Sequence, residues 1–238
     1  MSQRLILAMG LVALAGCAAR VPKASELVRV PDGCDLPAWE SSYRYLLAQQ
    51  QPPNQDPPLI RALILFEHSY PDKWADIEQA QSLLAGGDQV RTLDLFWRGL
   101  MHSALAMDES RNPFERLGSF QTGMREIDEA IQAEPDCLIF RLKRAEALQF
   151  VPAMFGRKDL LKQDLSWLHA RGDQLADYPF WAGFLDLVFA TEAHQNDQPA
   201  ERDAYLVKTQ KAWTDLGLQT YFETKIQQKR FGQGAGSE

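Results

Sequence analysis

The sequence predicts an all-α fold, and two patterns lead to this prediction. Apolar residues recur at intervals of three and four along most of the chain after Trp39, which is the spacing of one helix face. No segment alternates apolar and polar residues as a half-buried strand does, and no Asn-Gly or Asp-Gly pair separates two strand-like runs. The chain has 238 residues, 45% of them hydrophobic, which suits one domain or two small ones with a sizeable core.

The first half of this region predicts helices over 37–51, 58–69, 72–85 and 88–107. The last of these is the clearest, because one side of it is apolar throughout. The residues on that side are Leu93, Phe96, Trp97, Leu100 and Ala104. The Gly-Gly pair that precedes Asp88 predicts a turn between helices, with the aspartate as N-cap, and not a phosphate-binding loop.

Three further helices are predicted over 119–134, 137–150 and 158–170. Each carries an apolar stripe at helical spacing. The stripes consist of Met124, Ile127 and Ile131, of Leu138, Leu142, Ala145 and Leu148, and of Leu161, Leu165 and Leu168.

The segment 178–190 is apolar on nearly all sides, and Asp186 is its only charged residue. A helix of this kind is normally buried on nearly all sides, so we expect it to form the core of the C-terminal half. An aromatic-lined ligand pocket around Trp181 is the alternative. Another helix is bracketed by Pro199 at its start and Gly217 at its end.

The N-terminus has the pattern of a secretory signal. Arg4 is followed by a short apolar run, which is too short for a membrane-spanning helix of about 20 residues. The run ends in Leu14-Ala15-Gly16-Cys17, which resembles the lipobox of bacterial lipoproteins. That resemblance implies that residues 1–16 are a removed signal peptide and that Cys17 is acylated and holds the protein on a membrane. Because Ala18 follows the cysteine in place of an aspartate, the resemblance further implies the periplasmic face of the outer membrane.

Residues 17–36 are expected to form a tether, 37–231 the helical domain and 232–238 a flexible tail. The chain has three cysteines, an odd number. If Cys17 is acylated, Cys34 and Cys137 remain as a pair that an oxidising periplasm would allow to form a disulfide. Two separate thiols are the alternative, with Cys137 buried beside the helix that follows it.

The segment GMREIDEAIQAEP resembles the second helix and closing proline of a tetratricopeptide (TPR) repeat, through Gly123, Ile127, Ala130 and Pro135. The next two helices offer Phe140, Ala145 and Leu148, and then Leu161, Leu165 and Leu168, at positions that suit the following repeat. The resemblance covers residues 95–170 and implies antiparallel helix pairs in a short α-solenoid. No third repeat is clear in the sequence, and an irregular helical bundle is the alternative.

Several classes of function find no support in the sequence. The net charge of −7 argues against nucleic acid as a partner, because neutralising phosphate needs a basic surface. The four histidines are far apart and form no i, i+4 pair, so we predict no metal site and no cofactor. Gly-x-Ser-x-Gly is absent, so no local motif marks a nucleophile. The acidic excess is expected on solvated helix faces.

The segment 108–118 interrupts the repeat register and predicts a long loop that carries binding function, or else a tolerated surface insertion. The candidate binding residues are Glu109, Arg111, Asn112 and Phe114. Glu109 and Ser110 also resemble the Glu-Ser neighbourhood of lytic transglycosylases, in which the glutamate is the general acid. The Gly-Leu-Met-Gln block of that family is missing after them.

Together these features favour a lipid-anchored, non-enzymatic adaptor or scaffold that binds a protein or peptide in the cell envelope. The warrant is the usual use of helical-repeat surfaces, which is an analogy of fold. A small-molecule-binding accessory lipoprotein of a transporter is the second hypothesis, and a peptidoglycan lyase using Glu109 is the third.

Overall fold

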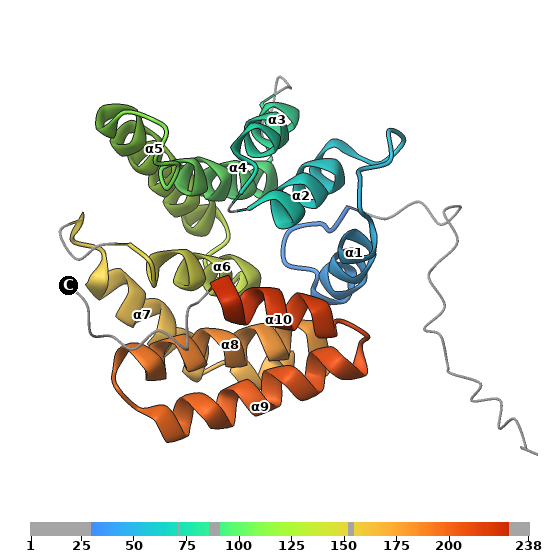
Figure 1. Cartoon of the computed structure of the whole chain (residues 1–238), viewed down its shortest axis with the longest axis vertical. Coiled ribbons are helices and arrows are strands. Elements are labelled where there is room, and N and C mark those ends of the chain that lie inside the picture. The colour runs from blue at the N-terminus through green and yellow to red at the C-terminus, as the bar shows by residue number, and fades with distance from the viewer. Residues whose placement is uncertain (1–29, 71, 86–90, 152–154, 229–238) are drawn as a thin grey trace, which may run out of the picture.

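The computed structural model describes residues 30–70, 72–85, 91–151 and 155–228, and within them it contains ten α-helices and no strand. The prediction of an all-α fold is confirmed (Figure 1). The helices are α1 (Leu36–Ala48), α2 (Pro58–Ser69), α3 (Trp74–Leu84), α4 (Thr92–Leu105), α5 (Pro113–Ala133), α6 (Leu138–Leu148), α7 (Lys158–His169), α8 (Pro179–Gln195), α9 (Pro199–Asp215) and α10 (Gln219–Gln228). A short 3-10 helix, Gly172–Leu175, precedes α8 and was not expected.

Local signals explain where several helices begin and end. A proline occupies the first position of α2, α5, α8 and α9, where its missing N–H costs no helical hydrogen bond. The Asp35 carboxylate accepts a hydrogen bond from the Ala38 N–H at 3.2 Å and so caps α1. After α9, Gly217 has a φ of +75°, a backbone conformation that glycine adopts without strain.

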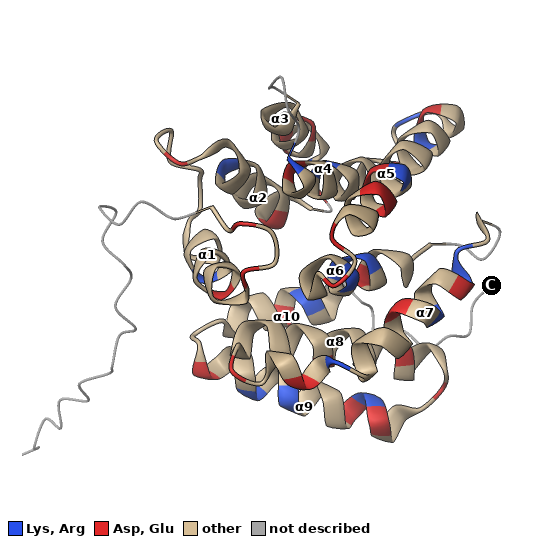
Figure 2. Ribbon diagram, turned by 180° about the vertical axis from the view of Figure 1, so that it is seen from behind, with Lys and Arg blue, Asp and Glu red and all other residues tan. Residues whose placement is uncertain are grey.

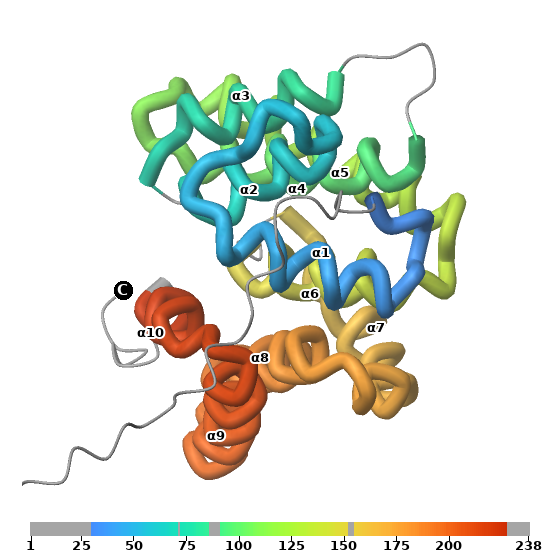
Figure 3. Tube along the Cα trace, turned by 90° about the vertical axis from the view of Figure 1, so that its right-hand side faces the viewer, coloured from blue at the N-terminus to red at the C-terminus, as the bar shows by residue number. Residues whose placement is uncertain are grey.

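Helices that follow each other in the chain pack against each other. The most extensive contacts join α4 to α5, α8 to α9 and α2 to α3. In Figures 1 and 3, α2 to α5 lie together on one side of the molecule and α7 to α9 on the other, with α1 and α6 between them. The protein therefore has two helical layers that meet at α1 and α6.

Glycines allow the closest approaches between paired helices. A Cβ atom added to Gly99 on α4 would lie 2.8 Å from the Gly123 carbonyl oxygen on α5. At the α8–α9 contact, a Cβ on Gly183 would lie 2.7 Å from the Trp213 indole nitrogen. Close helix packing at these two points depends on the absence of a side chain.

The centre of the molecule is a cluster of aromatic rings, to which α8 contributes most. Tyr43 lies between Trp97, at 6.0 Å, and Trp181, at 4.6 Å between ring centroids. Phe180 and Trp181 are fully buried, as are most residues of α8. The expectation that this apolar helix forms a core is confirmed.

The structure corrects the predicted loop 108–118. The helix expected over 119–134 begins at Pro113, so only residues 106–112 link α4 to α5. The residues that interrupt the spacing of the predicted repeats form about two further turns at the start of α5. These turns are mostly exposed, although Phe114 and Leu117 lie three positions apart, the spacing of one helix face.

Candidate functional site

The predicted binding residues lie at the corner where α4 turns into α5. Asn112 is the N-cap of α5, and its side-chain oxygen accepts hydrogen bonds from the N–H groups of Phe114 at 3.0 Å and Glu115 at 2.9 Å. This arrangement fixes the direction in which α5 begins. The Phe114 side chain is 86% exposed, the largest exposure of any bulky apolar side chain in the described residues.

Ion pairs and hydrogen bonds hold this corner in place. Arg111 contacts Glu78 of α3 and donates to the Asp108 carboxylate at 3.3 Å. Asp108 also accepts from the Ser110 hydroxyl at 2.7 Å. The corner is thus tied to a neighbouring helix, which limits its motion relative to the domain.

The first turns of α5 extend past the end of α4. A Cβ on Gly123 would meet the Ser103 backbone, so these two residues are level with each other, and α4 ends at Leu105. The turns of α5 before residue 120 therefore have no α4 residue beside them. On this extension Phe114 and Leu117, which is 39% exposed, lie one turn apart on the same side of the helix.

The alternative hypotheses rest on two residues, Glu109 for the peptidoglycan lyase and Trp181 for the small-molecule pocket. Glu109 is exposed, so no apolar pocket encloses its carboxylate. Trp181 is fully buried, and its ring packs against Tyr43, Phe180 and Phe184 at 4.6, 5.0 and 5.9 Å. Its environment is that of a packed core residue.

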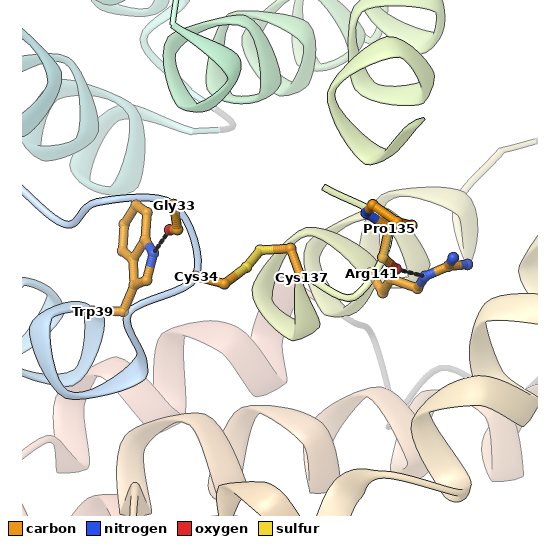
Figure 4. The surroundings of a disulfide bond; sticks show 6 residues. All are labelled: Gly33, Cys34, Trp39, Pro135, Cys137 and Arg141. Atoms are coloured by element: carbon orange, nitrogen blue, oxygen red, sulfur yellow. Dashed lines mark hydrogen bonds between the residues drawn. A yellow bond between two sulfur atoms is a disulfide. The ribbon is translucent and has the colours of Figure 1, made fainter. Parts of the chain in front are cut away.

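Cys34 and Cys137 form a disulfide, with their Cα atoms 5.3 Å apart (Figure 4). Cys137 is the N-cap residue of α6, and Cys34 lies before α1. Beside the bridge, the Trp39 indole N–H donates to the Gly33 carbonyl at 2.9 Å. Residues 30–35, assigned to the tether from the sequence, are thus fastened to the helical domain.

One group of side chains in the described regions has the proximity that a metal site requires. The ligand atoms of Cys34, Glu134 and Cys137 lie within 4.8 Å of one another. Because the two sulfur atoms are joined in a disulfide, they are not available as thiolate ligands. The structure therefore offers a cross-link here in place of a metal site.

The sequence did not reveal a buried cluster of charges around Glu67 of α2, whose side chain is 2% exposed. One carboxylate oxygen, Oε1, accepts from the Tyr43 hydroxyl at 3.2 Å and lies 3.6 Å from the Lys143 ammonium. The other oxygen, Oε2, accepts from the Tyr221 hydroxyl at 3.2 Å and lies 3.4 Å from the Lys225 ammonium. The helices that supply these charges, α2, α6 and α10, can be followed in Figure 2.

The electrostatics of this cluster follow from its burial and its charge pairing. Burial by itself raises the pKa of Glu67, but Lys225, Lys143 and the Tyr43 hydroxyl lower it to about 2. Burial likewise disfavours the charged form of Lys143, yet Glu146 and Glu67 raise its pKa above the ordinary value. Glu67 and Lys143 are therefore both ionised at neutral pH, and Glu146 supplies a second carboxylate 2.8 Å from the Lys143 ammonium.

One member of this cluster, Lys143, has a sequence context that indicates burial. Lys143 lies in a helix whose other residues are mainly apolar or small, one position after Leu142 of the apolar stripe. The expectation that the acidic residues occupy solvated helix faces is wrong for Asp164, which is fully buried against Arg144. Lys225 of α10 is likewise buried and pairs with Glu67.

Comparisons of the chain with protein-family models, curated proteins and solved structures find no match. Among the described helices, none has the length and apolar character needed to cross a bilayer. The predicted signal peptide, the lipidation site Cys17 and the tail 232–238 lie outside the described residues. Function is therefore inferred from the sequence and from the geometry of the side chains above.

Proposed function

We propose that this protein is a lipid-anchored lipoprotein of the cell envelope that acts as a protein-binding adaptor. The anchor is Cys17, and the proposed address is the periplasmic face of the outer membrane. The disulfide between Cys34 and Cys137 supports an oxidising compartment, since such bonds are rare where thiols are kept reduced. We further propose that the consecutive helix pairs are TPR-like repeats, a view supported by the small residues at the α4–α5 crossing.

The single observation that carries the adaptor proposal is the exposure of Phe114 on the extension of α5. Burying a phenylalanine side chain contributes about 1.5–3 kcal/mol, so a fully exposed one on a fixed helix is suited to docking. Leu117, on the same side of α5 and 39% exposed, enlarges the apolar area. The capping by Asn112 and the pairing of Arg111 with Glu78 mean that little ordering is needed on binding.

Photo-crosslinking in intact envelopes tests this proposal. We would replace Phe114, Leu117 or Val207 individually by a photoreactive phenylalanine analogue; Val207 is 66% exposed on α9 and serves as the control. We expect positions 114 and 117 to capture the same protein and position 207 not to capture it. Pull-down should then lose that protein with Phe114→Glu and keep it with Val207→Glu. Equal capture from all three positions, or retention by Phe114→Glu, would refute the docking role of α5.

The anchor has its own test. Mass spectrometry of the protein purified from membranes should find acyl chains on Cys17 as the first residue. Cys17→Ser should move the protein out of the membrane fraction, while Cys34→Ser should leave it there. A Cys17→Ser variant that stays membrane-bound would contradict the lipoprotein proposal.

A further inference from the structure

The last described helix, α10, is held on the domain in an unusual way. Among the side chains described on this helix, only that of Lys225 is buried, and the residue is 8% exposed. Its apolar residues Tyr221, Phe222 and Ile226 are half-buried. Of the described helices, only α9 runs close to α10 over several residues. The Lys225 ammonium and the Tyr221 hydroxyl both reach the buried Glu67 carboxylate, so polar groups of this helix extend into the domain.

Glu67 divides its two oxygens between the domain and α10. Oε1 is bound by Tyr43 of α1 and Lys143 of α6, whereas Oε2 is bound by Tyr221 and Lys225 of α10. If α10 leaves, Glu67 keeps a hydroxyl donor and an ammonium partner inside the domain. Lys143 is shared, because it also pairs with Glu146 at 2.8 Å, but Glu67 still has a cation and a hydroxyl donor beside it when α10 is absent. The main cost of opening a buried ion pair, an isolated charge, is thereby avoided for Glu67.

An aromatic floor lies next to this carboxylate. The Tyr221 ring is 6.0 Å from Phe180 and 5.0 Å from Trp213, measured between centroids. Trp213 is itself fixed, because its indole N–H donates to the Phe180 carbonyl at 3.0 Å. Together Glu67, Phe180 and Trp213 form a surface that accepts an aromatic side chain and, beside it, a cation.

Tyr221 and Lys225 match this surface because they are four positions apart, and so lie on one face of a helix. We infer that the surface formed by Glu67, Phe180 and Trp213 is a docking groove for a partner helix with an aromatic residue and a Lys or Arg four positions later. In the free protein α10 occupies the groove and keeps it closed. This groove is separate from the α5 extension, so it stands or falls independently of the proposed docking at Phe114.

A peptide-binding experiment on the full chain tests the inference. The probe is a fluorescein-labelled peptide of residues 216–228, and its binding is followed by anisotropy. The full-length Tyr221→Ala/Lys225→Ala variant, whose own α10 is weakened, should bind the peptide at least about tenfold more tightly than the wild type. A peptide with Tyr221→Ala and Lys225→Glu should bind at least about tenfold more weakly. Thr220→Ala/Thr224→Ala, which alters exposed positions of the same helix, should behave as the wild type.

Hydrogen exchange distinguishes a displaceable helix from a structural one. In the wild type, α10 amides should exchange at least about tenfold faster than those of α8, and in the Tyr221→Ala/Lys225→Ala variant faster still, with α8 protection unchanged. Three results would overturn the inference: α10 exchanging as slowly as α8, loss of α8 protection in the variant, or no peptide binding by a variant whose α10 is released. Loss of crosslinking at Phe114 would concern the α5 surface and leave this result unaffected.

Discussion

Gly99 and Gly123 face each other where α4 crosses α5, so closely that neither position has room for a methyl group. A Cβ on Gly123 would lie 2.5 Å from the Gly99 carbonyl oxygen and 2.7 Å from the Ser103 backbone nitrogen. Both neighbours are backbone atoms of a packed helix and cannot move aside independently. The separation of the two helices is therefore set by these glycines.

Gly123→Ala should destabilise the protein. The added methyl group must push α4 and α5 apart, and overpacking of this kind costs about 1–3 kcal/mol in the free energy of unfolding. Urea denaturation followed by far-UV circular dichroism measures the change.

Gly118→Ala in the same helix is the matched control. A Cβ there meets nothing within 4 Å, and alanine is favoured over glycine in a helix by about 0.5–1 kcal/mol. The two substitutions should therefore shift the unfolding midpoint in opposite directions. A Gly123→Ala protein as stable as the wild type would contradict the close crossing.

The sequence predicts features that depend on neighbouring residues, and it misses contacts between residues far apart in the chain. Helix starts at Pro58 and Pro199 were predicted at the residues where the structure has them, because a proline at the first helical position is a local signal. The start of α5 was missed although Asn112-Pro113 carries the same signal, because the polar residues from Glu109 to Asn112 favour an exposed loop. The contact between Glu67 and Lys225 joins the second helix to the tenth, and no local pattern encodes such a pairing.

Reduction of the disulfide should lower stability. The bridge spans a sequence separation of 103 residues, and in the chain-entropy model closing such a loop contributes up to about 4–5 kcal/mol. Cys34→Ser is the suitable variant because Cys34 is partly exposed, whereas Cys137 is buried. Thermal unfolding with and without dithiothreitol measures the difference.

The wild type should lose stability on reduction, and Cys34→Ser should start from the lower value and show no further loss. Peptide mapping of the unreduced protein should recover Cys34 and Cys137 in one cross-linked fragment. A wild-type melting temperature that does not respond to reduction would argue against the bridge.

Glu67 should make stability fall in acid. Its folded-state pKa is lowered from 4.5 to about 2, so its contribution is fully present above pH 4.5 and is lost as pH falls towards 2. Glu67→Gln should lower the free energy of unfolding by about 3–5 kcal/mol at neutral pH, since the buried Lys225 loses its carboxylate partner and Lys143 keeps only Glu146. It should also flatten the acid limb of the stability profile, measured by urea titrations at a series of pH values.

Glu78→Gln is the control for Glu67, because Glu78 also pairs with a basic side chain, that of Arg111, but is itself 55% exposed. An exposed ion pair contributes about 0–1 kcal/mol, so this variant should remain close to the wild type at every pH. Equal losses in the free energy of unfolding for Glu67→Gln and Glu78→Gln would mean that the buried cluster contributes no more to stability than an exposed ion pair.

Asp186 should have the opposite effect on stability. Burial raises its pKa from 3.8 to about 6, and Lys208 offsets this only in part, so the folded state disfavours its charged form. The penalty is present above pH 6 and disappears as pH falls through 6 towards 3.8. Asp186→Asn should therefore stabilise the protein at neutral pH, by about 1 kcal/mol once the partial exposure of the side chain is considered. The stability gap to the wild type should close in acid, whereas Asp203→Asn, a change at a side chain 62% exposed on α9, should produce no such gap. An Asp186→Asn variant that is less stable than the wild type at neutral pH would mean that this carboxylate is favourably paired, because only a favourable partner for the ionised group reverses the sign.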